Sequence, residues 1–222
     1  MIYQHDAQEA KREPNTGVIS EFPPEPAFTI DGVSPWQTMS EYLQGRGISF
    51  ATARYNGCYP IWRKGLRMYI PAVTRVDGHH YWQARSMDGD QLRYESPFGP
   101  RRDALIVAKR VAGREWGLIN VVIVEGPLDA LAVAETPGIP ALIGIALMGV
   151  KPPEEALVHL SYLLHKWRPQ SIKCIADSDS VGEMMKIQGW LSMRGYPSEL
   201  RIPQWFKDVC EGTPEQREEL LR

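Results

Sequence analysis

The second half of the chain alternates short apolar segments with longer segments of helical character, and this rhythm constrains the fold more than any other feature. The apolar segments are rich in β-branched residues, as strands buried on both faces are. Strands that alternate with helices of this length pair in parallel through right-handed crossovers. The sequence therefore predicts an α/β open sheet. We expect its strands at residues 118–124, 141–147, 171–176 and 199–202, and its helices at residues 127–135, 153–167 and 181–194.

The first half of the chain instead holds short β-rich segments separated by turn signals. An Asp-Gly pair lies in each of two expected turns, at residues 76–79 and 88–90, and this dipeptide favours tight hairpins. This part therefore reads as a small, mostly antiparallel β unit. We expect its strands at residues 66–73, 80–85 and 91–94.

A short helix is expected before this β unit, at residues 35–46, with Ser34 as its N-cap and Pro35 at its first helical position. The proline-rich segment 21–26 joins neither a helix nor a central strand, which predicts an extended N-terminus. The expected organisation is a flexible tail or linker at residues 1–33, a basic β-rich unit at 34–116, an α/β unit at 117–210, and a C-terminal tail or short helix at 211–222.

Charge is distributed unevenly along the chain. Residues 46–114 carry 13 Lys/Arg against 5 Asp/Glu, a net charge of +8, whereas residues 1–45 and 115–222 each have a net charge of −5. A solvated basic face is the ordinary explanation for such a segment. Beside an acidic segment, a surface that attracts a polyanion by releasing its counterions explains the pattern better.

Composition excludes several other classes of protein. Three scattered cysteines form no CxxC pair, so neither a disulfide framework nor a zinc ribbon is expected. No apolar run approaches the ~20 residues of a membrane span, and the polar N-terminus is no signal peptide. We expect a reduced, cytoplasmic protein that does not contact a membrane.

Acidic residues follow the expected strands of the α/β unit. An E-G-x-x-D pattern brings Glu125 and Asp129 after the first strand, a D-x-D pattern brings Asp177 and Asp179 after the third, and Asp208 follows the fourth. In open α/β sheets the carboxyl ends of the strands carry function. Each element alone has an ordinary explanation as a surface acid or a turn. Together they predict a site for Mg²⁺, which prefers oxygen ligands.

Two of these segments resemble a known family. Residues 121–134 (VVIVEGPLDALAVA) and 172–182 (IKCIADSDSVG) resemble the Toprim domain of primases, topoisomerases, small nucleases and recombination mediators. Further segments favour the catalytic core of bacterial and phage (DnaG-like) DNA primases. These are residues 42–49 (YLQGRGIS), 66–85, 93–97 (RYESP), 200–203 (LRIP) and 207–209 (KDV), so that the resemblance covers roughly residues 40–210.

The resemblance implies a role for each candidate residue. Glu125 would support general-base or metal chemistry at the incoming 3′-hydroxyl, and Asp129 would complete the acidic edge. The implied catalytic residues are Glu125, Asp129, Asp177 and Asp179, and the implied ligands of Mg²⁺ or Mn²⁺ are Glu125, Asp177, Asp179 and Asp208. The residues implied to contact the triphosphate or the template backbone are Arg67, Arg85, Arg93 and Lys207.

The implied activity is synthesis of short RNA primers on single-stranded DNA from nucleoside triphosphates, with DNA primers as a variant. A metal-dependent Toprim nuclease and a non-catalytic nucleic-acid-binding module are the alternatives, and a topoisomerase is disfavoured. Cys210 stands where the family often has a second acid, with Glu211 as a candidate substitute. The set of motifs is compact and phage-like. The expected partner is therefore a replicative helicase or a separate template-recognition subunit.

Overall fold

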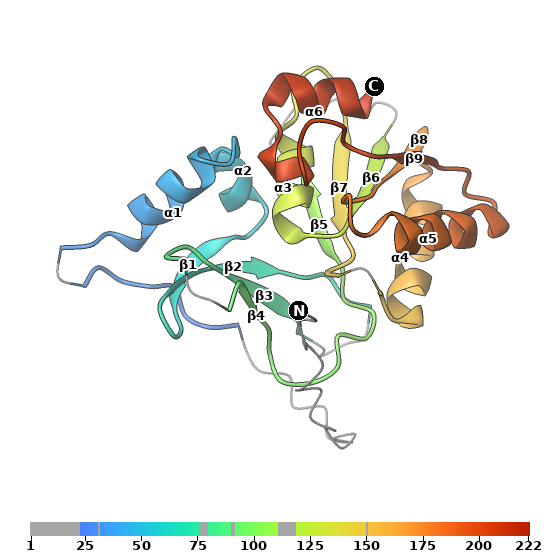
Figure 1. The fold of residues 1–222 in the computed structure, drawn as a ribbon. Coiled ribbons are helices and arrows are strands. Elements are labelled where there is room, and N and C mark those ends of the chain that lie inside the picture. Colours follow the sequence, from blue (N-terminus) through green and yellow to red (C-terminus); the bar gives the residue numbers. More distant parts are fainter. Residues whose placement is uncertain (1–22, 31, 76–79, 90–91, 111–118, 150) are drawn as a thin grey trace, which may run out of the picture.

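Two β-sheets organise the chain in a computed structural model (Figure 1). The structure describes residues 23–30, 32–75, 80–89, 92–110, 119–149 and 151–222. One sheet has four strands and is antiparallel, and the other has five strands and is largely parallel. The expected α/β class, with a smaller β-rich unit before the main sheet, is confirmed.

The first sheet has the order β1-β2-β3-β4. Strand β2 is buried along almost its whole length, since Met68 and Ile70 enter the main core on one face while Tyr69 packs on Trp82 on the other. The elements of this half are α1 (Pro35–Gln44), α2 (Phe50–Tyr55), β1 (Tyr59–Trp62), β2 (Leu66–Pro71), β3 (Trp82–Ser86) and β4 (Tyr94–Glu95).

The expected helix in this half is α1, capped by Ser34 as predicted, because the Ser34 side chain accepts a hydrogen bond from the amide of Gln37. The strands expected at 66–73 and 80–85 are β2 and β3, which pair antiparallel. The turn expected at 76–79 lies outside the described residues. Of the last expected strand, 91–94, residue 91 lies outside the described residues, and the segment that pairs with β3 is Tyr94–Glu95. Helix α2 and strand β1 were not predicted.

The second sheet has the order β5-β7-β6-β8-β9. Its four predicted strands pair in parallel, and the three helices between them form where the sequence predicted, within one residue at each end. Leu118 lies outside the described residues. The elements are β5 (Ile106–Lys109), β6 (Asn120–Val124), α3 (Pro127–Glu135), β7 (Leu142–Ala146), α4 (Glu154–Trp167), β8 (Ser171–Ile175), α5 (Val181–Met193) and β9 (Glu199–Arg201).

The edge strand β5 was not predicted, and it makes the sheet mixed rather than wholly parallel. It belongs to the basic segment 34–116, yet it pairs antiparallel with β7. The pairing places the apolar side chains of β5 in the two large cores, one on each face of the sheet. These side chains are thereby removed from water. The β5 segment therefore links the basic half of the chain to the acidic half.

Helix α3 lies between the two halves, and this position decides where the acidic residues go. Its residues from Pro127 to Ala134 are all buried, and Leu128 and residues 130–134 share one core with α1 and β2. Helices α4 and α5 cover the opposite face of the second sheet (Figure 1). Close packing of α3 on β7 needs Gly144, because a Cβ there would lie 2.3 Å from the carbonyl oxygen of Ala130.

The C-terminal segment packs back on α3. A short 3₁₀ helix, η1 (Val209–Glu211), contacts α3, and α6 (Pro214–Leu221) follows, closed at its start by a Thr213–Gln216 capping box. The buried Arg217 of α6 donates hydrogen bonds to the carbonyls of Ala132, at 3.1 Å, and Gly47, at 2.8 Å. Arg217 thus joins the loop after α1 to α3.

Across the residues that the structure describes, no helix is both long enough and apolar enough to cross a membrane.

Candidate active site

The acidic residues gather at one edge of the second sheet, as the strand order predicts. Glu125 directly follows β6, Asp177 follows β8 after one residue, and Asp129 lies in the first turn of α3. Asp208 precedes η1, on the chain that leaves β9. Because β6, β8 and β9 are parallel and adjacent, their carboxyl ends meet at this edge.

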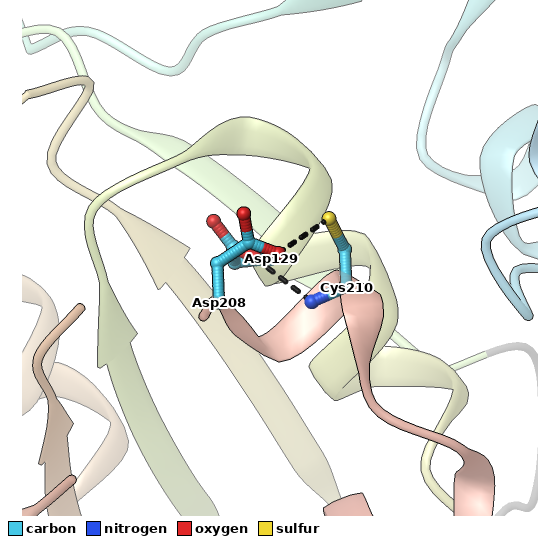
Figure 2. A group of neighbouring side chains, drawn as sticks. All are labelled: Asp129, Asp208 and Cys210. Carbon is cyan, nitrogen blue, oxygen red and sulfur yellow. Dashed lines mark hydrogen bonds between the residues drawn. The ribbon is translucent and has the colours of Figure 1, made fainter. Parts of the chain in front are cut away.

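Three of the side chains form an inner group, consisting of Asp129, Asp208 and Cys210 (Figure 2). Their ligand atoms all lie within 4.8 Å of one another. The amide of Cys210 donates to Oδ1 of Asp129 at 3.0 Å, and its thiol donates to Oδ1 of Asp208 at 3.0 Å. Both Asp129 and Cys210 are buried, whereas Asp208 is half-buried.

The glycine of the E-G-x-x-D pattern has a clear role here. A Cβ on Gly126 would lie 2.6 Å from Oδ2 of Asp129, so any other residue at this position would displace the carboxylate. The pattern is therefore needed for the close approach of Asp129 to the backbone before α3.

A second, more exposed group at the same edge, called the outer group, consists of Glu125, Asp177 and Asp179. Glu125 and Asp177 are half-buried, while Asp179 is exposed. The ammonium of Lys207 lies 3.7 Å from Oδ2 of Asp179. Lys207 is thus a cation on the rim of the outer group.

Burial and mutual repulsion both raise the pKa values of these carboxyl groups. The pKa of Asp129 rises to about 7, first because it is buried and then because Asp208 and Asp177 are close. The pKa of Asp177 also rises to about 7, through burial and then through Glu125, Asp208 and Asp179. Burial raises the pKa of Glu125 too, although a hydrogen bond from Ser180 and the charge of Lys207 oppose the rise.

This crowding fits a divalent cation. Carboxylates in mutual contact favour protonation, and a bound cation removes that pressure by stabilising the ionised forms. The donors are oxygens from separate loops, which suits a hard cation such as Mg²⁺. The inner group departs from this set only in the sulfur of Cys210.

The four basic residues suggested by the sequence have different surroundings. Arg93 and Lys207 are exposed. Arg67 is fully buried, where its guanidinium donates to the carbonyls of Arg63 and Leu92, both at 2.8 Å, and lies 3.7 Å from a carboxylate oxygen of Glu95. Arg67 therefore holds the first sheet together and presents no surface to a phosphate, because the strand that carries it is covered on both faces.

Arg85 lies between the basic sheet and the acidic edge. It is 8% exposed, donates to the hydroxyl of Tyr42 at 2.8 Å, and stacks over the ring of Tyr94 with its guanidinium carbon 4.9 Å from the ring centre. Burial raises the pKa of the Tyr94 hydroxyl, and the charges of Asp129 and Cys210 add to the rise against the opposing effect of Arg85. The aromatic cluster around Arg85 is thus close enough to the inner group for electrostatic interaction with it.

Sequence reasoning missed the part played by Arg46. Its guanidinium donates to the sulfur of Cys210 at 3.3 Å, so the helix α1 region contacts the acidic edge directly. Nearby, the hydroxyl of Ser49 donates to Glu135 of α3 at 2.9 Å. The signal was the segment YLQGRGIS, whose Arg46 and Ser49 contact the acidic half at Cys210 and Glu135, but no spacing rule predicts contacts over such a separation.

No protein-family model matches the sequence, and no curated protein matches it. Solved structures do match the fold. The primase fragment of the bacteriophage T7 primase-helicase protein is 20% identical, with a TM-score of 0.53, and the match covers 81% of this chain and 73% of that one.

Bacterial proteins match equally well. The RNA polymerase domain of the Mycobacterium tuberculosis primase DnaG is 15% identical, with a TM-score of 0.56 over 85% of this chain and 74% of that one. The E. coli primase catalytic core is 13% identical, with the same TM-score and the same coverage of both chains. At these identities the likeness concerns the fold.

Proposed function

On the premise that the chain has the fold of the catalytic core of DnaG-type primases, we propose that it is a primase-type nucleotidyltransferase. It synthesises short RNA primers on single-stranded DNA and depends on Mg²⁺ or Mn²⁺. The observation that supports this most is the convergence of Glu125, Asp129, Asp177, Asp179 and Asp208 at the carboxyl edge of a primase-type sheet. In a fold of this kind, that edge is where ligands bind.

The metal ligands in this proposal are Glu125, Asp177, Asp179 and Asp208. A metal held by these residues would supply positive charge at the reacting phosphates, to orient the 3′-hydroxyl and to offset charge on the leaving pyrophosphate. Burial raises the pKa of Glu125 above its ordinary value, which is the direction expected of a carboxylate that accepts the proton of the 3′-hydroxyl. Asp129 accepts the Cys210 amide and keeps η1 in place beside the metal ligands.

Phosphate binding falls to the exposed cations. Lys207 lies on the rim of the outer group, and Arg93 is exposed beside β4. An arginine binds phosphate with two parallel hydrogen bonds, whereas lysine acts as a point charge. Arg85 has a supporting part, because it donates to the Tyr42 hydroxyl and stacks over the ring of Tyr94. Arg67 has no part in phosphate binding here.

The partners in this proposal are a single-stranded DNA template, nucleoside triphosphates and a replicative helicase or template-recognition subunit. The M. tuberculosis primase domain was solved with double-stranded DNA, and another primase catalytic domain was solved bound to single-stranded DNA. The T7 fragment comes from a primase-helicase protein. These neighbours support the choice of template and of partner.

A primer-synthesis assay tests the proposal. The protein is incubated with single-stranded DNA, labelled nucleoside triphosphates and Mg²⁺ or Mn²⁺, and the products are separated by length. Wild type is compared with Glu125→Gln, Asp177→Asn and a control, Glu219→Gln, which removes an exposed carboxylate from α6. We expect short products from wild type and control and none from the two site variants.

Two other outcomes would replace the proposal. Degradation of the template, lost in Asp177→Asn, would indicate a metal-dependent nuclease that uses the same carboxylates with water as the nucleophile. Binding of single-stranded DNA with neither synthesis nor degradation, even after addition of a helicase, would indicate a non-catalytic module.

A further inference from the structure

We propose that the indole ring of Trp205 stacks on the base of the incoming nucleoside triphosphate while the phosphates bind at the outer group. The inference rests on the function proposed above and adds to it a contact with the base. Trp205 lies between the segments LRIP and KDV, and the family resemblance assigns no role to the residues between them. An indole can stack on any nucleobase, because every base has a π-face.

Trp205 is the tryptophan whose ring the protein leaves uncovered. It is 62% exposed, more than any other tryptophan that the structure describes. The chain has seven tryptophans, and Trp116 lies outside the described residues. The indoles that contact a cation, an aromatic ring or a backbone carbonyl are those of Trp36, Trp62, Trp82, Trp167 and Trp190. Within the part of the chain that the structure describes, Trp205 has no such contact, so its ring is open to a ligand.

Exposure alone would assign Trp205 no role, because single apolar side chains are common on protein surfaces. Its position in the chain supplies the second observation. Lys207, whose ammonium lies 3.7 Å from Oδ2 of Asp179, is two residues away, and Asp208 is three residues away. Since a chain spans at most about 3.6 Å per residue, the Cα atoms of Trp205 and Asp208 lie within about 11 Å of each other. A nucleotide with its phosphates at the outer group can therefore reach the indole with its base.

The loop that carries Trp205 is fixed close to the indole. The ring of the next residue, Phe206, packs over Gly212, where a Cβ would lie 3.1 Å from the ring. The amide of Lys207 donates to a carboxylate oxygen of Glu211 at 3.4 Å. Phe206 is half-buried, whereas Trp205 and Lys207 on either side of it are exposed. The loop thus presents an aromatic ring and a cation to solvent together, and a fixed loop loses little freedom when a ligand binds.

The charges beside the indole favour a nucleotide over a protein partner. A protein segment that covered Trp205 and its neighbourhood would also cover Lys207 and Asp179, whose side chains are 56% and 69% exposed. Removal of water from both charges is costly. A nucleoside triphosphate instead combines a polyanion, for the cation and the metal-binding acids, with a flat aromatic base for the indole. Because stacking tolerates every base, Trp205 contributes affinity and leaves the choice of base to the template.

Direct binding tests the inference without reference to synthesis. The protein is titrated calorimetrically, in the presence of Mg²⁺, with ATP and separately with inorganic tripolyphosphate, which has phosphates but no base. Loss of one base–aromatic stack corresponds to a decrease in affinity of about 5–150-fold. We expect Trp205→Ala to bind ATP more weakly by a factor in this range and to bind tripolyphosphate as wild type does. Trp205→Phe keeps an aromatic ring and should retain most of the affinity for ATP.

Trp62→Ala is the matched control, because it removes an exposed indole from the first sheet. This variant should bind ATP as wild type does. Three results would overturn the inference: no binding of ATP by wild type, equal affinity for ATP in wild type and Trp205→Ala, or an equal loss of affinity for ATP and tripolyphosphate in Trp205→Ala.

Steady-state kinetics separate the incoming nucleotide from the template strand. Loss of a contact made equally in the ground state and the transition state raises KM and leaves kcat unchanged. Trp205→Ala should therefore raise KM for nucleoside triphosphates by about the factor seen in binding, with KM for template and the thermal unfolding midpoint unchanged. A raised KM for template with an unchanged KM for nucleotide would assign the indole to the DNA strand and overturn the inference.

The two assays also distinguish this contact from the proposed function. ATP binding that depends on Trp205, in a protein that makes no primers, would keep the stacking contact and remove the primase. Primer synthesis with the same nucleotide KM in wild type and Trp205→Ala would do the reverse.

Discussion

The arginines of the first sheet and the acids of the second sheet both depart from ordinary surface charge, but in opposite ways. Arg67 is buried with two backbone carbonyls and Glu95 around it, and Arg85 is held by Tyr42 and Tyr94. The acids at the edge of the second sheet instead lie close to one another, and burial first and mutual repulsion second raise the pKa values of Asp129 and Asp177. Groups of the protein itself bind part of the basic charge. The acidic side chains instead repel one another, and a bound cation would stabilise their ionised forms.

The arginines stabilise the fold through their contacts. The acids are instead kept by the fold in positions where burial and repulsion disfavour their charged forms. Removing a charge from the first kind should cost stability. Removing a charge from the second kind should cost function and leave stability intact or higher, a pattern common at active sites. The following changes test that separation.

The largest expected effect is on activity, in Asp177→Asn. Loss of one charge-stabilising group at a reacting centre typically costs about 1000-fold, and we expect a decrease of this order in the rate of primer synthesis. Because burial and then repulsion from neighbouring carboxylates disfavour the ionised form of Asp177, the thermal unfolding midpoint of the variant without metal should equal or exceed that of wild type. A clear fall in that midpoint would place Asp177 among the residues that hold the fold.

Replacement of Arg67 should have the reverse effect. Arg67→Met leaves Glu95 and two backbone carbonyls without the buried guanidinium, and we expect the free energy of unfolding to fall by about 3 kcal/mol. Urea unfolding measures this change. The matched variant Arg93→Met removes an exposed guanidinium from the same half and should change stability by less than about 0.5 kcal/mol. Equal losses would show that burial does not separate the two residues.

The pH dependence of stability should report the inner group. The folded-state pKa of Asp129, about 7, lies above its ordinary value, so its ionisation weakens folding. Its contribution is favourable below the ordinary pKa and is lost as the pH rises through about 7. The unfolding midpoint of metal-free protein should therefore be higher at acidic than at mildly alkaline pH.

Asp129→Asn isolates this contribution. The variant keeps an oxygen to accept the Cys210 amide but no longer ionises, so the fall in unfolding midpoint with pH should shrink, and Glu219→Gln should retain the full wild-type fall. A change of 1 kcal/mol corresponds to about 2–4 °C in a domain of this size. A slope unaffected by Asp129→Asn would mean that the carboxyl does not titrate in this range.

The smallest expected effect is on DNA binding, in Arg93→Met. One lost phosphate contact lowers the slope of log affinity against log salt by about 0.7 for single-stranded DNA. Fluorescence anisotropy with a labelled oligonucleotide at several salt concentrations measures that slope. An unchanged slope would remove Arg93 from the proposed phosphate contacts.

The sequence was informative where local rules apply. Helix α3 was predicted at its observed bounds because Pro127 begins it and a buried strand precedes it. The convergence of Glu125, Asp177 and Asp208 followed from parallel strand order alone. Such features depend on periodicity, capping and topology, all of which are visible in a single chain.

The sequence was uninformative where distant segments meet. Strand β5 is four residues long and is defined only by its pairing with β7. Arg67 resembles a surface cation, because nothing in its neighbours shows that the sheet is covered on both faces. Arg46 meets Cys210 across 164 positions of the chain, a contact that depends on the packing of η1 on α3.

The measurement that tests the central claim most directly is Mn²⁺ binding to the outer group, followed by electron paramagnetic resonance. If the crowded carboxylates are a metal site, wild type binds Mn²⁺ saturably, and Asp177→Asn binds it at least about tenfold more weakly. Glu219→Gln binds it as wild type does. Equal affinity in wild type and Asp177→Asn, or no saturable binding by wild type, would contradict the account.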